Sequence, residues 1–174
     1  MVCNIDWGLD MITVRKATLD DLNDITEIYN EAILKTVATF DMETKSLKEQ
    51  KIWFKSHGPK NPILVAEQDG FVVGFASLSE WSDRCAYSDT AEVSLYVKEE
   101  HQGRGIGKKL MKAIIKEGAK AGLHAVIARI TEGNEKSIFL HESVGFESIG
   151  IMKEVGYKFD KRLDVYLMEK IYDS

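Results

Sequence analysis

Between residues 63 and 114 the hydrophobic pattern of the chain changes its period once, and the change falls on a run of alternating glycines. Residues 63–78 hold two apolar runs joined at Asp69-Gly70, a dipeptide typical of the tight turn in an antiparallel hairpin. Residues 90–97 form a third strand-like run. Beyond the glycines, apolar residues recur at helical spacing from Ile106 onward. This segment therefore predicts three strands, a glycine-rich turn and an amphipathic helix, in that order.

The flanking segments continue the alternation of strands and helices. A capping box at Thr18 and Asp21 predicts a helix that runs to about Leu34, and a second helix is expected to start after Ser46. We also expect strands at residues 12–15, 124–130, 146–156 and 162–170, and a helix at residues 134–144. Hairpins followed by strand–helix–strand–helix predict an α+β fold in which a mixed sheet has helices on both faces.

Composition limits the class of protein. The 174 residues suffice for one ordinary domain, which we expect over residues 11–174, with residues 1–10 as an N-terminal extension. Hydrophobic residues make up 44% of the chain and charged residues 29%, as is usual in globular proteins. The net charge of −5 argues against a nucleic-acid-binding protein with a broad basic face. No apolar run approaches the ~20 residues that span a bilayer, so no membrane association is expected.

Cysteine usage and the N-terminus bear on the compartment. Cys3 and Cys85 lie far apart and neither belongs to a CxxC pair, so we expect neither a metal site nor a disulfide framework. The first ten residues have no basic segment and no sustained apolar core, which argues against a signal peptide. These features predict a cytoplasmic protein.

The most informative motif is the glycine-rich turn at residues 102–108. Glycines let main-chain N–H groups approach a ligand, and the helix N-terminus adds positive charge that Arg104 and Lys108 supplement. Such a turn suits a diphosphate. A Walker loop fits poorly because Gly107-Lys108 is followed by Lys109, and the dinucleotide fingerprint fits poorly because the glycines are spaced GxGxG. A plain turn that binds no ligand remains the alternative.

The turn resembles the Gln/Arg-x-x-Gly-x-Gly/Ala signature of the GCN5-related N-acetyltransferases, and here it reads Gln102-Gly103-Arg104-Gly105-Ile106-Gly107. A narrower resemblance, to the phosphinothricin/methionine-sulfoximine acetyltransferase branch, rests on residues 90–97, residues 134–142 with Gly145-Phe146, and Leu163-Asp164-Val165. The resemblance covers residues 11–170. It implies a mostly antiparallel sheet splayed into a V, with acetyl-CoA as the acyl donor and no metal. It further implies direct attack, in a ternary complex, by the primary amine of an amino acid or analogue. Because the family often forms dimers, a homodimer is also expected.

The resemblance also implies the coenzyme contacts. The strand before the turn supplies main-chain partners for pantetheine, the glycine turn binds the diphosphate, and the start of a later helix adds polar contacts. These residues are Leu95, Tyr96, Val97, Gln102, Gly103, Arg104, Gly105, Ile106, Gly107, Lys108, Asn134 and Ser137. A main-chain N–H at or near Val93 is expected to polarise the thioester carbonyl.

Two residues are candidates for the chemistry. Direct transfer needs a neutral amine, and a carboxylate suffices to take its proton. The resemblance assigns this role to Glu92, which shares a strand face with Ser94 and Tyr96; a structural salt bridge is the alternative. His141 stands where most of the superfamily has a tyrosine that protonates the departing thiolate. His141 is therefore a candidate acid or a partner of Glu92 in base catalysis, and the alternative is a core histidine bonded to the main chain.

Acceptor recognition is expected from two loops. The guanidinium of Arg84 suits a substrate carboxylate, Tyr87 follows it, and Phe40 matches an aromatic wall position of the branch. Arg162 stands where the family often has tryptophan, a departure that leaves the preferred acceptor open. A polyamine, an aminoglycoside or a protein N-terminus as acceptor, and a sensor that binds acyl-CoA without turnover, are the alternatives.

Overall fold

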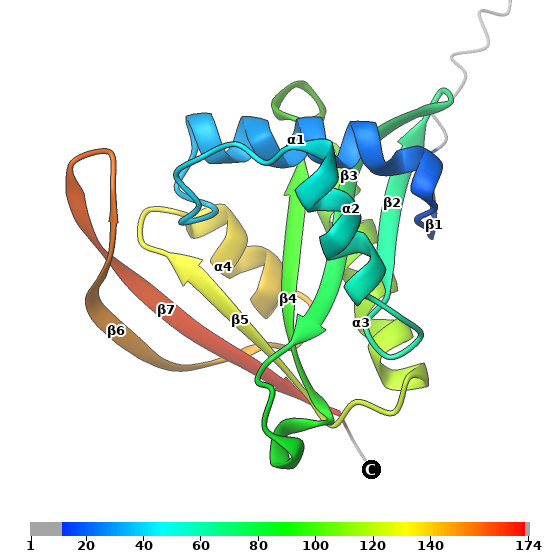
Figure 1. Ribbon diagram of the computed structural model, residues 1–174. Helices are drawn as coiled ribbons and strands as arrows, with labels where there is room; N and C mark the ends of the chain where they lie inside the picture. Colours follow the sequence, from blue (N-terminus) through cyan, green and yellow to red (C-terminus); the bar gives the residue numbers. More distant parts are fainter. Residues whose placement is uncertain (1–11, 173–174) are drawn as a thin grey trace, which may run out of the picture.

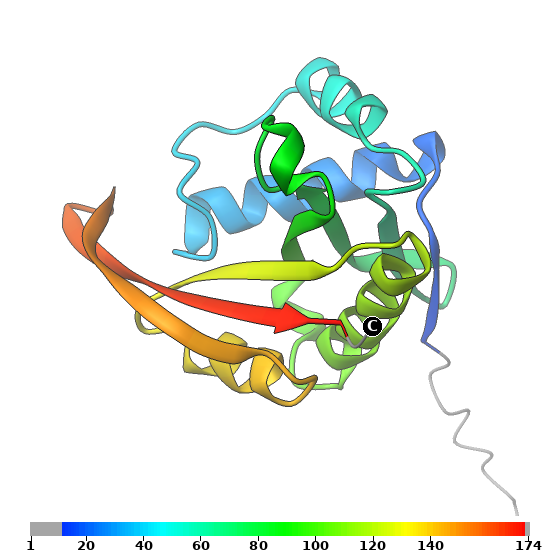
Figure 2. The same cartoon turned by 90° about the horizontal axis from the view of Figure 1, so that it is seen from below.

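The computed structural model describes residues 12–172. The strands are β1 (Thr13–Lys16), β2 (Ile63–Gln68), β3 (Phe71–Glu80), β4 (Thr90–Val97), β5 (Ala125–Thr131), β6 (Glu147–Lys158) and β7 (Lys161–Ile171). The helices are α1 (Leu22–Lys35), α2 (Leu47–Ser56), α3 (Ile106–Lys120) and α4 (Glu135–Glu142). One seven-stranded sheet has the order β1-β2-β3-β4-β5-β7-β6. Helices α1 and α2 cover one face of the sheet and α3 and α4 the other (Figures 1 and 2), which confirms the predicted α+β fold.

The predicted elements match the observed ones to within a few residues. Helix α2 begins directly after Ser46, whose main-chain N–H donates to the Glu49 carboxylate at 2.8 Å while the Glu49 N–H donates to Ser46 Oγ at 3.3 Å. The turn between β2 and β3 falls at Asp69-Gly70, where φ is 53° and 83°. Two consecutive positive φ values suit a two-residue hairpin turn. The expected N-terminal extension, residues 1–10, lies outside the described residues.

Two hydrophobic clusters attach the helices to the sheet. Helix α3 buries Leu110, Met111 and Ile114 completely on one face. On the other face, Ile25 and Ile28 of α1 pack against the side chains of β2 and β3. Full burial of each such side chain contributes about 1.5–3 kcal/mol, so both layers are fixed against the strands that carry the site.

The sheet splits between β4 and β5. These strands run parallel and pair only over Thr90–Glu92 and Ala125–Ile127, and beyond that point they diverge (Figure 1). On its other edge β4 stays paired with β3 along its whole length, and β5 stays paired with β7. The divergence therefore opens a gap in the middle of the sheet, which is the V-shaped splay that the family resemblance implied.

The long β6–β7 hairpin closes one side of this gap. It curves away from the rest of the sheet (Figure 2) and is held to the loop between α1 and α2 at two points. The ring of Phe40 lies directly against Gly156, where any Cβ would collide with it. The buried Lys158 donates from Nζ to the carbonyl of Thr39 at 2.7 Å. These contacts fix the hairpin as one wall of the gap.

Within residues 12–172, no helix is both long enough and apolar enough to cross a membrane.

Candidate active site

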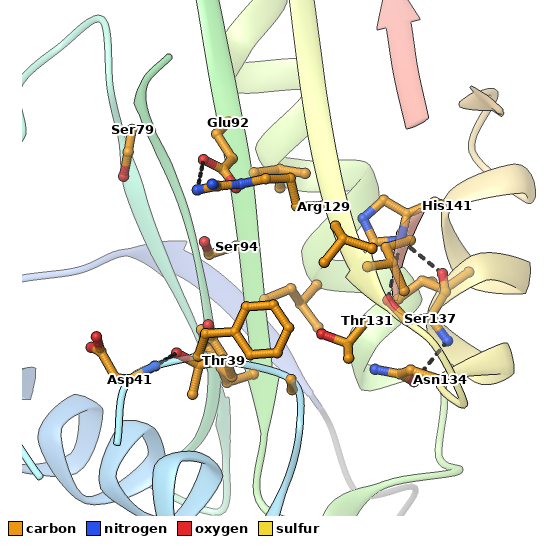
Figure 3. A pocket seen from close by; sticks show the side chains of 18 of the residues that line it. Thr39, Asp41, Ser79, Glu92, Ser94, Arg129, Thr131, Asn134, Ser137 and His141 are labelled. Carbon is orange, nitrogen blue, oxygen red and sulfur yellow. Dashed lines mark hydrogen bonds and ion pairs between the residues drawn. The ribbon is translucent and has the colours of Figure 1, made fainter. Parts of the chain in front are cut away.

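A cavity of about 590 Å³ lies where β4 and β5 diverge (Figure 3). Its walls come from the loop after α1, strand β4, strand β5, helix α4 and the β6–β7 hairpin, together with Tyr29 of α1 and Ser79 of β3. Of the predicted site residues, the structure brings together here Phe40, Glu92, Leu95, Tyr96, Asn134, Ser137 and His141. Residues about a hundred positions apart in sequence therefore share one cavity.

Glu92 lies in the cavity beside an arginine that is not among the predicted site residues. Arg129 of β5 donates from Nε to Glu92 Oε1 at 2.6 Å and from Nη2 to Glu92 Oε2 at 2.7 Å. These bonds and the opposite charge raise the pKa of the Arg129 guanidinium, against the effect of burial. The guanidinium carbon lies 5.9 Å from the centre of the Trp81 ring, within cation–π range. The salt bridge that was the structural alternative for Glu92 is thus present, inside the cavity.

Arg129 could have been singled out from the sequence. It interrupts an otherwise apolar strand, and its place two residues after Ile127 puts it on the strand face that Glu92 shares. A charged residue in such a run needs a partner. Which partner it has depends on strand pairing, because Glu92 lies 37 residues away in the chain.

His141 lies on the opposite wall, in α4, and is buried. Its Nδ1 is 2.7 Å from the main-chain carbonyl of Ser137, and because a carbonyl can only accept, Nδ1 carries the proton. The neutral ring therefore presents an unprotonated Nε2, which faces the Arg129 side of the cavity (Figure 3). Burial lowers the pKa of His141 below its ordinary value of 6.5, although the bond with Ser137 opposes that shift. His141 is thus both a residue bonded to the main chain and a cavity residue with a free basic nitrogen.

The main chain of β4 presents unpaired groups at the gap. Trp81 N–H donates to the carbonyl of Thr90 at 3.3 Å and Lys98 N–H to the carbonyl of Val73 at 2.9 Å, so even-numbered residues of β4 bond to β3. Hydrogen bonds alternate in direction along an antiparallel strand, so the odd-numbered residues face β5. Past Glu92 there is no β5 partner. The N–H of Val93 completes the last rung with Ile127, so the C=O of Val93 and both main-chain groups of Leu95 point into the gap. The N–H of Val97 also lacks a strand partner there, whereas its C=O accepts from Gln102 Nε2.

Tyr96 behaves differently from its two neighbours among the predicted pantetheine contacts. Its main chain pairs with Phe75 of β3, and its side chain packs on the rings of Tyr29 and Phe75. Burial raises the pKa of Tyr29 to about 12, and the Tyr29 hydroxyl donates to Asp41 Oδ2 at 2.7 Å. This network stiffens the wall behind β4 and includes Asp41, which the sequence did not single out.

A second cavity, also of about 590 Å³, adjoins the first and reaches the glycine-rich turn. The two share lining residues at the splay, among them Leu95, Asn134 and Ser137. Gly103 and Gly105 have φ of 77° and 79°, and Gly105 is the residue that precedes α3. Such backbone favours glycine. Nine of the predicted coenzyme residues line this cavity: Leu95, Tyr96, Val97, Gln102, Gly103, Ile106, Gly107, Asn134 and Ser137.

The remaining predicted residues lie outside the two cavities. Arg104, Gly105 and Lys108 are exposed on the turn and on the first turn of α3. Arg84 and Tyr87 are exposed on the segment between β3 and β4, which forms a short 3₁₀ turn at Cys85–Tyr87. In the part of the chain that the structure describes, no group of three His, Cys, Asp or Glu residues is arranged to hold a metal ion.

Comparison with known proteins agrees with this geometry. The family model for the acetyltransferase (GNAT) domain matches residues 14–167. The chain belongs to the GNAT acetyltransferase family.

Individual relatives place it within that family. The chain is 38% identical over 164 residues to the L-methionine sulfoximine/L-methionine sulfone acetyltransferase of Salmonella typhimurium, covering 94% of this chain and 96% of the relative. A solved Salmonella typhimurium acetyltransferase with its cofactor acetyl-CoA superposes with a TM-score of 0.92 at 37% identity, covering 94% and 95% of the two chains. A phosphinothricin acetyltransferase from Sinorhizobium meliloti in complex with acetyl-CoA gives 0.89 at 36% identity, covering 92% and 88%.

Proposed function

We propose that this protein transfers the acetyl group of acetyl-CoA to the α-amino group of an amino acid or an amino-acid analogue such as methionine sulfone. The observation that carries the proposal is the meeting of two cavities at the splay of β4 and β5. One cavity holds Glu92 and His141, and the other reaches the glycine turn. The relatives named above act on this class of acceptor or bind this coenzyme.

The residues on the coenzyme side fit a long, phosphorylated thioester. Leu95, the C=O of Val93 and the N–H of Val97 offer unpaired main-chain groups to an extended amide arm, as another strand would. Gln102 Nε2 donates to the carbonyl of Val97 at 3.1 Å and so links the arm site to the glycine turn. The N–H groups of that turn and of the first turn of α3 suit the diphosphate. Bound acetyl-CoA supplies an acetyl group that is already activated.

The residues on the acceptor side carry out the proton transfers. The Glu92 carboxylate binds the acceptor ammonium and removes the proton that must leave before attack. As the nitrogen attacks, it loses a second proton, which Nε2 of His141 accepts and then returns to the departing thiolate. A main-chain N–H on β4 near Val93, beyond the last rung with β5, donates to the carbonyl oxygen on which charge develops. One proton thus leaves through Glu92, and one passes from nitrogen to sulfur.

The test is thiol release from acetyl-CoA with a panel of acceptors: L-methionine sulfone, free amino acids, a polyamine and an aminoglycoside. We expect turnover with the amino acids and with methionine sulfone. Glu92→Gln should lower kcat by about 10²-fold or more and leave acetyl-CoA affinity unchanged, because a general base contributes in that range. Glu147→Gln, which changes an exposed carboxylate on β6 outside both cavities, is the matched control. Turnover confined to polyamines or aminoglycosides, or binding of acetyl-CoA without any turnover, would overturn the proposal.

Assembly and location are proposed on separate grounds. The β6–β7 hairpin exposes large apolar side chains at the edge of the sheet: Ile149, Ile151, Tyr157 and Phe159. An exposed apolar edge favours pairing with a second copy. Cys85 is a free, exposed thiol, which suits a reducing compartment such as the cytoplasm.

A further inference from the structure

We propose that Arg129 and Glu92 together recognise the acceptor as a zwitterion, with the acceptor carboxylate on Arg129 and its ammonium on Glu92. The inference rests on the proposed function and deepens it, because it names the residue that reads the carboxylate. It assigns that contact to a residue inside the cavity rather than to Arg84 on the exposed loop.

The position of the Glu92–Arg129 ion pair supports this role. Glu92 lies on the last paired rung of β4 with β5, opposite Ile127, and Arg129 is the next residue of β5 on that face. The pair therefore lies at the apex of the gap, inside the cavity that also holds His141 and where the attacking nitrogen must arrive. An ion pair that only held the strands together would serve equally well at the far end of the paired segment.

Both side chains of the ion pair are accessible from the cavity. The Arg129 side chain is 53% exposed and that of Glu92 is 20% exposed, and both line the acceptor cavity. The guanidinium carries five donors, of which this pair uses Nε–H and one N–H of Nη2. Its remaining donors are free to take a second carboxylate. The Trp81 ring supports the guanidinium while its partner changes.

The charges of the ion pair are complementary to those of an amino-acid zwitterion. In an α-amino acid the ammonium nitrogen and the carboxylate carbon are attached to the same carbon atom, so the two charges are as close as the charges of the Glu92–Arg129 pair. Entry of the zwitterion exchanges one internal ion pair for two, so neither protein charge is left without a partner. An amine without a carboxylate takes Glu92 and leaves Arg129 unpaired, which is unfavourable in a partly buried site. The exchange also frees Glu92 from two N–H donors at the moment when it must accept a proton.

The same arrangement opposes polycationic acceptors. Arg129 places a fixed positive charge beside the carboxylate that would bind their ammonium groups. Like charges at this distance repel. Selection for amino acids over polyamines thus follows from the ion pair itself.

The experiment compares L-methionine sulfone with its carboxamide, which keeps the amine and removes the carboxylate charge. In the unmodified protein, kcat/KM should be at least about 10-fold higher for the acid, since a charge-assisted bond is worth that much. In Arg129→Met the ratio of acid to amide should fall by about 10- to 100-fold, mainly through KM for the acid. The amide should keep its kcat/KM or gain, because no ion pair has to open. Arg129→Lys should restore part of the preference.

Lys120→Met is the matched control, since it removes a cation with a 2.6 Å carboxylate partner, Glu117, away from both cavities. It should leave the ratio unchanged. An equal loss for acid and amide in Arg129→Met would overturn the inference and make the pair purely structural. So would a collapse of the ratio in Arg84→Ala but not in Arg129→Met, or an unmodified protein that does not distinguish acid from amide. In these cases the unmodified protein still acetylates amino acids, so the proposed function survives; absence of all amino-acid turnover would overturn both.

Discussion

At the scale of single residues, hydrogen-bond partners decide what Glu92 and His141 can do. Both were catalytic candidates from the sequence, and for both a purely structural role was the alternative. The structure contains the contacts expected for that role: Glu92 is in a salt bridge, and His141 is bonded to the main chain. Both contacts are compatible with the roles proposed for these residues. The bond from Nδ1 to Ser137 fixes the tautomer that leaves Nε2 of His141 basic.

The protonation state of His141 gives a testable pH dependence. Because burial lowers the pKa of His141 below 6.5, the ring is neutral at pH 7, and a neutral ring can accept but not donate at Nε2. We therefore expect protonation of His141 to leave kcat unchanged between pH 7 and about 6.5. At lower pH kcat should fall, because the ring then gains a proton. The measurement is kcat against pH at saturating substrates.

His141→Gln provides the comparison. It should lower kcat by about 10²-fold and remove the step below pH 6.5, while acetyl-CoA affinity by calorimetry stays the same. A rate that instead rises as pH falls through this range would mean that His141 donates its proton first, as an acid.

At the scale of elements, the glycine turn and the splayed strand form a surface made largely of main chain, which we propose binds acetyl-CoA. The sequence predicted that these glycines bind a diphosphate. A side chain at Gly105 and one at Gly107 would have different effects on the structure. Gly105 has a positive φ of 79°, whereas a Cβ on Gly107 would meet only Leu140 and Leu95, at 3.5 and 3.7 Å. Gly107 is within α3 and lines the second cavity.

Alanine at the two glycines should therefore have opposite effects on stability. Gly107→Ala should raise the free energy of unfolding by up to about 1 kcal/mol, the difference in helix propensity, while weakening acetyl-CoA binding because the methyl group stands in the path of the diphosphate. Gly105→Ala should lower the free energy of unfolding by about 1–2 kcal/mol because of its left-handed backbone. Urea unfolding and calorimetry with acetyl-CoA separate the two effects. Unchanged affinity in Gly107→Ala would mean that the diphosphate does not approach this turn.

At the scale of the whole molecule, the β6–β7 hairpin forms one edge of the sheet. Strand β7 pairs with β5, and Phe40 and Lys158 hold the far end of the hairpin, but its outer strand β6 has no neighbour on one side. The hairpin walls the acceptor cavity with Met152, Val155 and Val165. A second copy seated on β6 would therefore also fix one wall of the site.

The expected assembly can be measured directly. Size-exclusion chromatography with light scattering should give twice the monomer mass at micromolar concentration. The double variant Ile149→Lys/Ile151→Lys should give the monomer mass, because two charges on an apolar edge oppose strand pairing. A monomer in the unmodified protein would contradict the proposal of a homodimer.

The sequence by itself determined the elements, since hydrophobic periodicity, the Asp69-Gly70 turn and the helix caps are local signals. It also determined the glycine turn and the candidates Glu92 and His141, because their spacing within strand and helix is local too. Only the tertiary structure decided which distant residues became partners. The short parallel pairing of β4 and β5 brings Arg129 next to Glu92. Beyond the end of that pairing the strands diverge, and the two adjoining cavities lie in the gap. Strand register and divergence depend on packing across the whole sheet, and no short stretch of sequence encodes them.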